Sequence, residues 1–279
     1  MSGAAPAASL FLADGDTYTP TEHTRGPWDP RALHGGAPAA LIASAFESLE
    51  PGAELRVARM RFQFLRPVPL APLALSTRIV RPGRRVQELE AELRVAGGDE
   101  NAGVTVCRAS ALRVRPVPDS VPESTGAGEL AVAADGALGT PGSAAPLLFA
   151  LDGTENEASF ATTAMEMRSL GDPRAPGPAS VWMRLALPLL PERPPSPLAR
   201  LAATADFGNG ISATLPFERY LFINADLTIQ LARHPAGEWI GLDARTLLHA
   251  GGTGLAESVL HDAGGPVGRA FQTLVVEPR

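Results

Sequence analysis

The 279-residue chain has no lysine, a single cysteine and few aromatic residues. All 24 of its basic side chains are arginines, and its 30 acidic residues leave a net charge of −6. An acidic chain without a basic stripe disfavours nucleic acid as the main partner. The lone cysteine, Cys107, excludes an intramolecular disulfide framework and any metal site with several cysteine ligands.

Long apolar runs are also missing. No uninterrupted stretch approaches the roughly 18 residues that indicate a membrane-spanning helix. The N-terminus has no basic segment before its short apolar stretch, so a signal peptide is not expected. Hydrophobic residues make up 45% of the chain and charged residues 19%, which is typical of a folded protein. We therefore expect a globular, cytoplasmic protein without a membrane span.

Several catalytic signatures are absent as well. The sequence has neither a G-x-S-x-G nucleophile elbow nor a P-loop. Its five histidines show no paired ligand spacing, so no metal is expected. Cys107 lies in an alternating strand pattern, where a small core residue is more common than a nucleophile. No cofactor is predicted.

The composition changes sharply in the middle of the chain. Nineteen of residues 117–146 are Pro, Gly, Ala or Ser, and the four charged residues there are all acidic. Such a stretch predicts a linker. We therefore expect a first module over 1–116, a linker over 117–155 and a second module over 156–279.

The two halves repeat one pattern. A helix over Pro38–Glu50 precedes four strands in the first half, and a helix over Pro197–Phe207 precedes a similar set in the second. Strand Gln87–Val95 alternates apolar and charged residues, as a strand with one buried face does. Pro67 and Pro235, like Gly83 and Gly251, are 168 residues apart. An internal duplication is predicted; two unrelated α+β stretches with similar turns remain the alternative.

A helix held by an antiparallel sheet, present twice, predicts an α+β fold of two helix-in-sheet modules packed as a pseudo-dimer. Single modules of this kind are called hotdog folds, so the expected architecture is a double hotdog.

Two stretches could carry chemistry. His34, Gly35 and Gly36 come directly before the first helix, whose first N–H groups lack partners within the helix and favour negative charge. They suit a polarised carbonyl oxygen or a phosphate; a tight turn is the plain alternative. In the second half, Asp226 lies in a strand of alternating polar residues. The 168-residue offset favours an inward Asp226, and a one-residue slip reverses that.

The order and spacing of several stretches resemble the acyl-CoA thioesterase II group of double-hotdog enzymes, and more closely its actinobacterial-type relatives. The matching stretches are HGGAPAALI (34–42), FLRPVPL and GRRVQELEAEL (64–93), AMEMRSL (164–170), VWMRL (181–185), LARLAATADFGNG (198–210), LDART and GGTGLAES (242–258), and VGRAFQTLVV (267–276). They cover nearly the whole chain outside the linker.

The resemblance implies hydrolysis of an acyl-CoA thioester by a water molecule held by an Asp, a Ser or Thr, and a Gln. By alignment these roles fall on Asp226, Thr246 and Gln272. The residues that follow Asp226 depart from the family's usual His and aromatic pair, which bears on the acyl pocket. Substrate binding is expected from the glycine turn and four arginines: His34, Gly35, Gly36, Arg59, Arg61, Arg84 and Arg85.

The duplication adds a prediction about the number of sites. The 168-residue offset, and 162 for the last strand, places Ala58, Arg78 and Ser110 opposite the three catalytic candidates, and that set cannot hold a water molecule in the same way. We expect one working site per chain, between the first helix and the second module's sheet. A non-catalytic acyl-CoA or apolar-ligand binding protein, and a hotdog hydratase or dehydratase, are the alternatives. A homodimer is expected.

Overall fold

The computed structural model describes residues 8–50, 54–97, 101–117, 138–150, 153–172, 175–191 and 193–279. Most of the predicted linker lies outside these residues. Its described part includes β7, which pairs with β8 in the second half of the chain. The module boundaries stay a prediction.

The described strands form one antiparallel sheet of fourteen strands in the order β1-β2-β4-β5-β6-β3-β11-β14-β13-β12-β9-β8-β7, with β10 paired to β14. The strands of the first half are β1 (Phe11–Asp14), β2 (Thr17–Pro20), β3 (Arg56–Phe64), β4 (Leu73–Arg81), β5 (Val86–Val95) and β6 (Thr105–Val114). Those that follow are β7 (Ala145–Leu147), β8 (Met165–Ser169), β9 (Ala179–Leu185), β10 (Tyr220–Asn224), β11 (Asp226–Leu231), β12 (Ile240–His249), β13 (Thr253–Asp262) and β14 (Gly265–Pro278).

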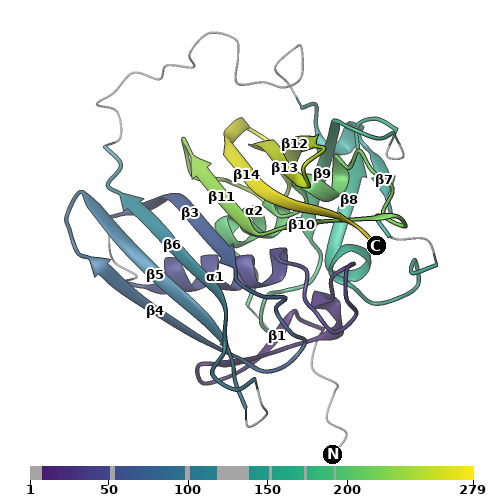
Figure 1. The fold of residues 1–279 in the computed structure, drawn as a ribbon. Helices are drawn as coiled ribbons and strands as arrows, with labels where there is room; N and C mark the ends of the chain where they lie inside the picture. The colour runs from purple at the N-terminus through teal and green to yellow at the C-terminus, as the bar shows by residue number, and fades with distance from the viewer. Residues whose placement is uncertain are drawn as a thin grey trace, which may run out of the picture.

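Three α-helices are described: α1 (Gly36–Ser48), α2 (Pro197–Ala205) and the single turn α3 (Gly208–Ile211). Short helical turns at Glu22–Thr24, Pro141–Ser143 and Phe160–Ala164 lie in the connections. Figure 1 shows the two halves of the sheet meeting at β3 and β11, with α1 running behind the strands of the first half. This is the double hotdog that the sequence predicts.

The alternation predicted for β5 is confirmed. Leu89 and Leu93 are fully buried, whereas the glutamates between them are partly exposed. At the seam of the two halves, Met60 and Phe62 of β3 are paired with Ile229 and Leu227 of β11, and all four are buried. The seam, where β3 pairs with β11, therefore has one buried face and one solvent-exposed face.

The two long helices pack against each other between the halves of the sheet. Their contact is close because α1 is rich in glycine and alanine on this side. A Cβ added to Gly36 would lie 2.6 Å from the Ala203 carbonyl oxygen of α2, closer than real Cβ contacts. This packing brings the start of α1 to the end of α2, where the candidate site lies.

Candidate active site

A cavity of about 460 Å³ opens where the start of α1, the end of β3, the break between α2 and α3, and β10 come together. His34, Gly35, Asp206 and Asn224 line its polar part. Most of the remaining wall is apolar. A concave, mostly apolar pocket with a few converging polar groups is the usual form of a small-molecule site.

Asp206 is the carboxylate of this cavity. It ends α2, and its side chain is only 3% exposed. The amide Nδ2 of Asn224 donates to its Oδ1 at 2.8 Å. The Nδ1 of His34 lies 3.0 Å from its Oδ2, and among the described residues this is its one ion-pair contact. The carboxylate is thus buried, oriented, and not neutralised by an arginine.

Gln272 of β14 holds the end of α2 in place. Its Nε2 donates to the Asp206 carbonyl oxygen at 3.1 Å and lies 3.5 Å from Oδ1. Its Oε1 accepts the backbone N–H of Asn209 at 2.9 Å. Gln272 is 1% exposed, so these hydrogen bonds are shielded from solvent water. The predicted site residue Gln272 therefore lies at the cavity, behind Asp206.

His34 stands between Asp206 and the start of α1. Its Nδ1 is 3.0 Å from Asp206 Oδ2 and also 3.0 Å from the backbone nitrogen of Gly36. Because Nδ1 carries either a proton or a lone pair, it makes only one of these hydrogen bonds at a time. The ring stacks on Phe207 with centroids 4.3 Å apart, which fixes its plane.

Gly35 is required by the approach of the carboxylate. A Cβ at this position would lie 2.8 Å from Asp206 Oδ2 and 3.0 Å from the Phe64 ring. Its backbone N–H has no hydrogen-bond acceptor among the described residues. His34 and Gly35 line the cavity, and Gly36 begins α1 directly behind them. Substrate binding by these residues stays a prediction.

Aromatic rings form one wall of the cavity. Phe207, Phe149, Phe217 and Trp28 follow one another in ring contact, the last two stacked with centroids 5.5 Å apart. The wall begins at His34, which stacks on Phe207. In a chain that is only 5% aromatic, this concentration makes the cavity a rigid apolar surface next to the carboxylate.

The prediction that Asp226 faces inward is wrong, because the strand is shifted by one residue from the 168-residue offset and Leu227 and Ile229 lie on the buried face instead. Asn224 is opposite Leu274 of β14, but Thr228 is opposite Phe271, so the strand holds one extra residue between them. Asn224 therefore faces the cavity, whereas Asp226 lies on the outer face. There the Asp226 Oδ1 accepts the backbone N–H of Thr273 at 2.8 Å.

Thr246 is buried but does not reach the carboxylate. Its hydroxyl is hydrogen-bonded to that of Ser212 at 2.7 Å, at the end of α3. It shares a face with Gln272, but Ala256 of β13 lies between them, so they are about two strand spacings, or 10 Å, apart. Of the three predicted catalytic residues, the structure places only Gln272 beside the cavity.

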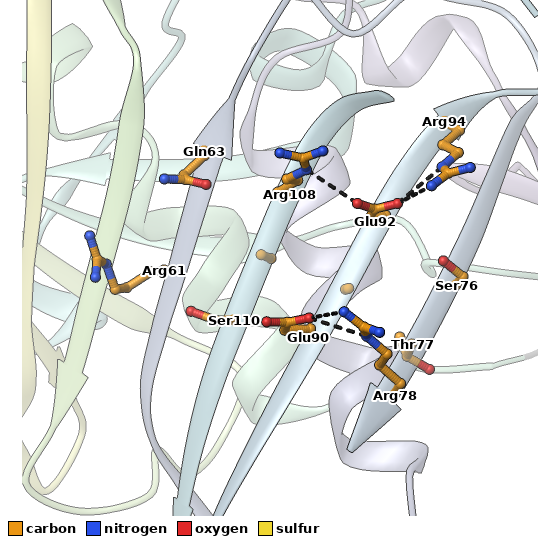
Figure 2. A pocket seen from close by; sticks show the side chains of 12 residues that line it. Arg61, Gln63, Ser76, Thr77, Arg78, Glu90, Glu92, Arg94, Arg108 and Ser110 are labelled. Atoms are coloured by element: carbon orange, nitrogen blue, oxygen red, sulfur yellow. Dashed lines mark hydrogen bonds and ion pairs between the residues drawn. The ribbon is translucent and has the colours of Figure 1, made fainter. Parts of the chain in front are cut away.

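The four predicted arginines lie away from the cavity. Arg59 and Arg61 are on the outer face of β3, and Arg61 is seen there in Figure 2. Arg84 and Arg85 are exposed in the turn between β4 and β5. That turn adjoins the first residues of β3, whereas the cavity is at the last, about 25 Å along the strand.

Sequence reasoning missed Asp206, Asn224 and Asn209. Asp206 and Asn209 stand in the matching stretch LARLAATADFGNG, where one acid ends an otherwise apolar helix. A lone carboxylate at the buried end of a helix is a signal that could have been used, since an unpaired buried charge is costly and is often functional. Asn224 was seen in the polar strand but was not singled out.

Two profiles of one protein family match the chain. The acyl-CoA thioesterase N-terminal domain matches residues 24–114, and the acyl-CoA thioesterase C-terminal domain matches residues 141–276. The chain belongs to the acyl-CoA thioesterase family. In these terms, the N-terminal thioesterase domain supplies His34 and Gly35, and the C-terminal one supplies Asp206, Asn224 and Gln272. The cavity lies where the two thioesterase domains meet.

Solved structures agree on the fold. An acyl-CoA thioesterase II from Mycobacterium marinum is 18% identical, with a TM-score of 0.61 over 96% of this chain and 94% of that one. A protein with a hot dog fold from Alicyclobacillus acidocaldarius is 16% identical, with a TM-score of 0.68 over 96% and 95%. A protein assigned as a thioesterase II from Thermobifida fusca is 17% identical, with a TM-score of 0.69 over 97% and 96%. No curated protein matches the chain.

Among the described residues, no group of three or more His, Cys, Asp or Glu is placed to hold a metal ion. No helix in this part of the chain is long and apolar enough to cross a membrane. Burial, with a smaller contribution from the charge of Asp206, raises the pKa of the Cys107 thiol to about 12, so the thiol stays protonated and unreactive at neutral pH.

Proposed function

We propose that this protein hydrolyses an acyl-CoA thioester to the free acid and CoA, with Asp206 as the general base. The observation that carries the proposal is a buried carboxylate that lines an apolar cavity and is oriented by Asn224 and His34 without a neutralising arginine. Such a group can accept a proton from water, which a carboxylate locked in an arginine pair does less readily.

The reaction needs one water molecule beside Asp206. Asp206 takes a proton as the water oxygen bonds to the thioester carbonyl carbon, and the carbonyl π electrons move to its oxygen. When this oxyanion collapses, the carbon–sulfur bond breaks and the leaving thiolate takes the proton from Asp206. The products are the acid and the CoA thiol, and the carboxylate is restored.

The start of α1 supplies a donor for the oxyanion. Gly35 lines the cavity, and its N–H has no acceptor in the described chain. The Gly36 backbone nitrogen lies behind it, 3.0 Å from His34 Nδ1. A backbone donor at a helix N-terminus stabilises developing negative charge, by roughly 3 kcal/mol in known oxyanion holes.

The acyl group would lie against the aromatic wall that runs from Phe207 to Trp28. The CoA arm would leave through the mouth of the cavity, which Leu65, Arg66 and Ala225 line. The predicted homodimer and the cytoplasmic location stay predictions.

A second activity is favoured by one observation. Asp206 and His34 are 3.0 Å apart, and an acid paired with a histidine is the pair expected of a hotdog hydratase or dehydratase. This alternative uses the same two side chains to move protons at the carbon chain rather than at the carbonyl carbon. Loss of absorbance from an enoyl-CoA without release of thiol would support it.

The test is a thiol-release assay across an acyl-CoA series with two matched variants. Asp206→Asn keeps an oxygen that can accept from Asn224 but removes the base, so we expect kcat to fall about 1,000-fold. Asp226→Asn changes the other candidate carboxylate, on the outer face, and should leave kcat within about twofold. If Asp226→Asn abolishes turnover and Asp206→Asn does not, the assignment of the base is wrong.

A further inference from the structure

A polar trough of about 670 Å³ lies on the outer face of the first half of the sheet, across β3, β6, β5 and β4 (Figure 2). Two rows of cross-strand neighbours form it. One row is Arg61, Ser110, Glu90 and Arg78, and the other is Gln63, Arg108, Glu92 and Ser76. Each row has one short serine, Ser110 or Ser76, among longer polar side chains.

The trough has an excess of positive charge. Its lining includes four arginines and two glutamates. Arg78 is bound to Glu90, and both Arg94 and Arg108 are bound to Glu92. Arg61 has no hydrogen bond or ion pair from its guanidinium to any described residue, and no dashed line reaches it in Figure 2.

The uncompensated charge follows from the neighbours of β3. Arg61 is flanked by Thr228 of β11 and Ser110 of β6, and neither is acidic. Arg59, two residues before Arg61 on β3, is flanked by Gln230 and Leu112, and its Nε is buried without a partner. On the equivalent face of the second half, Arg245 and Arg269 are both bound to Glu257. Free cations on this face thus lie at the seam, where the carboxylate of Asp226, opposite Gln63, accepts the Thr273 N–H.

The trough begins beside the mouth of the active-site cavity. Leu65 and Ala225 line that mouth, and the Phe64 N–H donates to the Ala225 carbonyl oxygen at its edge. On β3, Gln63 directly precedes Phe64, points to the outer face and lines the trough. Arg61 is on the same face, about 7 Å further along the strand. A ligand that leaves the cavity between Leu65 and Ala225 meets Gln63 and Arg61 next.

We propose that this trough holds the phosphate groups of CoA, with Arg61 as the principal contact. The inference rests on the proposed function, because it assumes that the thioester carbonyl is at Asp206. Phosphates are bound well by guanidinium groups, which present several donors in a fixed plane. The Ser110 hydroxyl and the Gln63 amide supply neutral donors next to Arg61.

The test compares two substrates with the same acyl group. The CoA thioester has phosphates, and the N-acetylcysteamine thioester has none. Arg61→Gln should raise KM for the CoA thioester about fivefold, the effect of losing a charge-assisted hydrogen bond at a wet site. It should leave kcat, and both constants for the N-acetylcysteamine thioester, unchanged. Arg245→Gln, on the same face of the sheet but in the second half, is the matched control.

Binding of adenosine 3′,5′-bisphosphate, measured by calorimetry, separates the two proposals. If both thioesters are hydrolysed and Arg61→Gln leaves KM for the CoA thioester unchanged, the trough is not the phosphate site, while the proposed function stands. If neither thioester is hydrolysed, the proposed function fails, and saturable bisphosphate binding that Arg61→Gln weakens still supports the trough. Binding that is equally strong in Arg61→Gln overturns it.

Discussion

The two ends of the helix pair occupy equivalent places in the duplicated fold but differ in chemistry. Where α2 ends and α1 begins, Asp206 faces a cavity of about 460 Å³. Where α1 ends and α2 begins, Glu47 faces one of about 160 Å³, and its carboxylate accepts the hydroxyl of Ser196 at the start of α2. Each end therefore has an acid next to the first residues of the other helix.

The strand residue that caps each helix makes the difference. Gln272 of β14 donates to the Asp206 carbonyl oxygen at the end of α2. Arg113 of β6 takes the same place at the other end, where it donates to the carbonyl oxygens of Phe46 and Leu49 and to Gln87. Both capping residues are buried. Gln272 is neutral, whereas the charge of Arg113 lowers the pKa of Glu47, although by less than burial raises it.

The first test places an arginine, the capping residue of the Glu47 end of the helix pair, at the Asp206 end. Gln272→Arg should lower kcat about 1,000-fold, because a guanidinium beside Asp206 stabilises its ionised form and makes it a weaker base. Gln272→Leu, which removes the amide without adding charge, should cost less activity. Circular dichroism of both variants separates loss of the base from loss of the fold; equal activity of the two would contradict the electrostatic argument.

The second test removes the capping arginine at the Glu47 end of the helix pair. Arg113→Met keeps most of the volume but leaves the carbonyl oxygens of Phe46 and Leu49 and the Gln87 side chain without their buried donor. We expect the free energy of unfolding to fall by about 3 kcal/mol. Urea denaturation measures this. Activity per folded molecule should not change, and a parallel loss of kcat would mean that the two ends are coupled.

The third test concerns the strand residue beside each acid. Asn224→Ala removes the hydrogen bond to Asp206 Oδ1, and kcat/KM should fall about tenfold to a hundredfold, the usual worth of a hydrogen bond to a buried charge. Val57→Ala, beside the smaller cavity that Glu47 faces, is the control and should alter stability only. Thiol release at saturating and limiting substrate shows whether kcat or KM carries the change.

The smallest effect is expected from Glu47. Burial raises the pKa of this carboxyl above its ordinary value, so its ionisation costs stability as the pH rises through that raised pKa. Glu47→Gln does not titrate and keeps an acceptor for Ser196. The variant should be more stable than the parent by about 1 kcal/mol at pH 8 and lose this advantage at pH 4. Denaturation curves at the two pH values would contradict this if the difference were independent of pH.

The architecture was within reach of the sequence because its signals are local. The alternation of Gln87–Val95 assigns Leu89 and Leu93 to one face of a strand whatever the rest of the chain does. The glycines before α1 likewise mark a close approach, which Asp206 turns out to make. Gln272 could be placed because β14 pairs with β13 in unbroken register from Gly268 to Val275.

The catalytic acid was decided by tertiary structure. One extra residue between Asn224 and Thr228 puts Asn224 and Asp226 on opposite faces, and that bulge is defined only by pairing with β14. Asp206 is likewise distinguished from Glu47 by its partner on the last strand, far away in sequence. Period-2 alternation and turn residues act between near neighbours, so the sequence alone determined the two modules and their strands. Which acid lies without an arginine beside it depends on contacts between strands and helices, and no local pattern encodes those contacts.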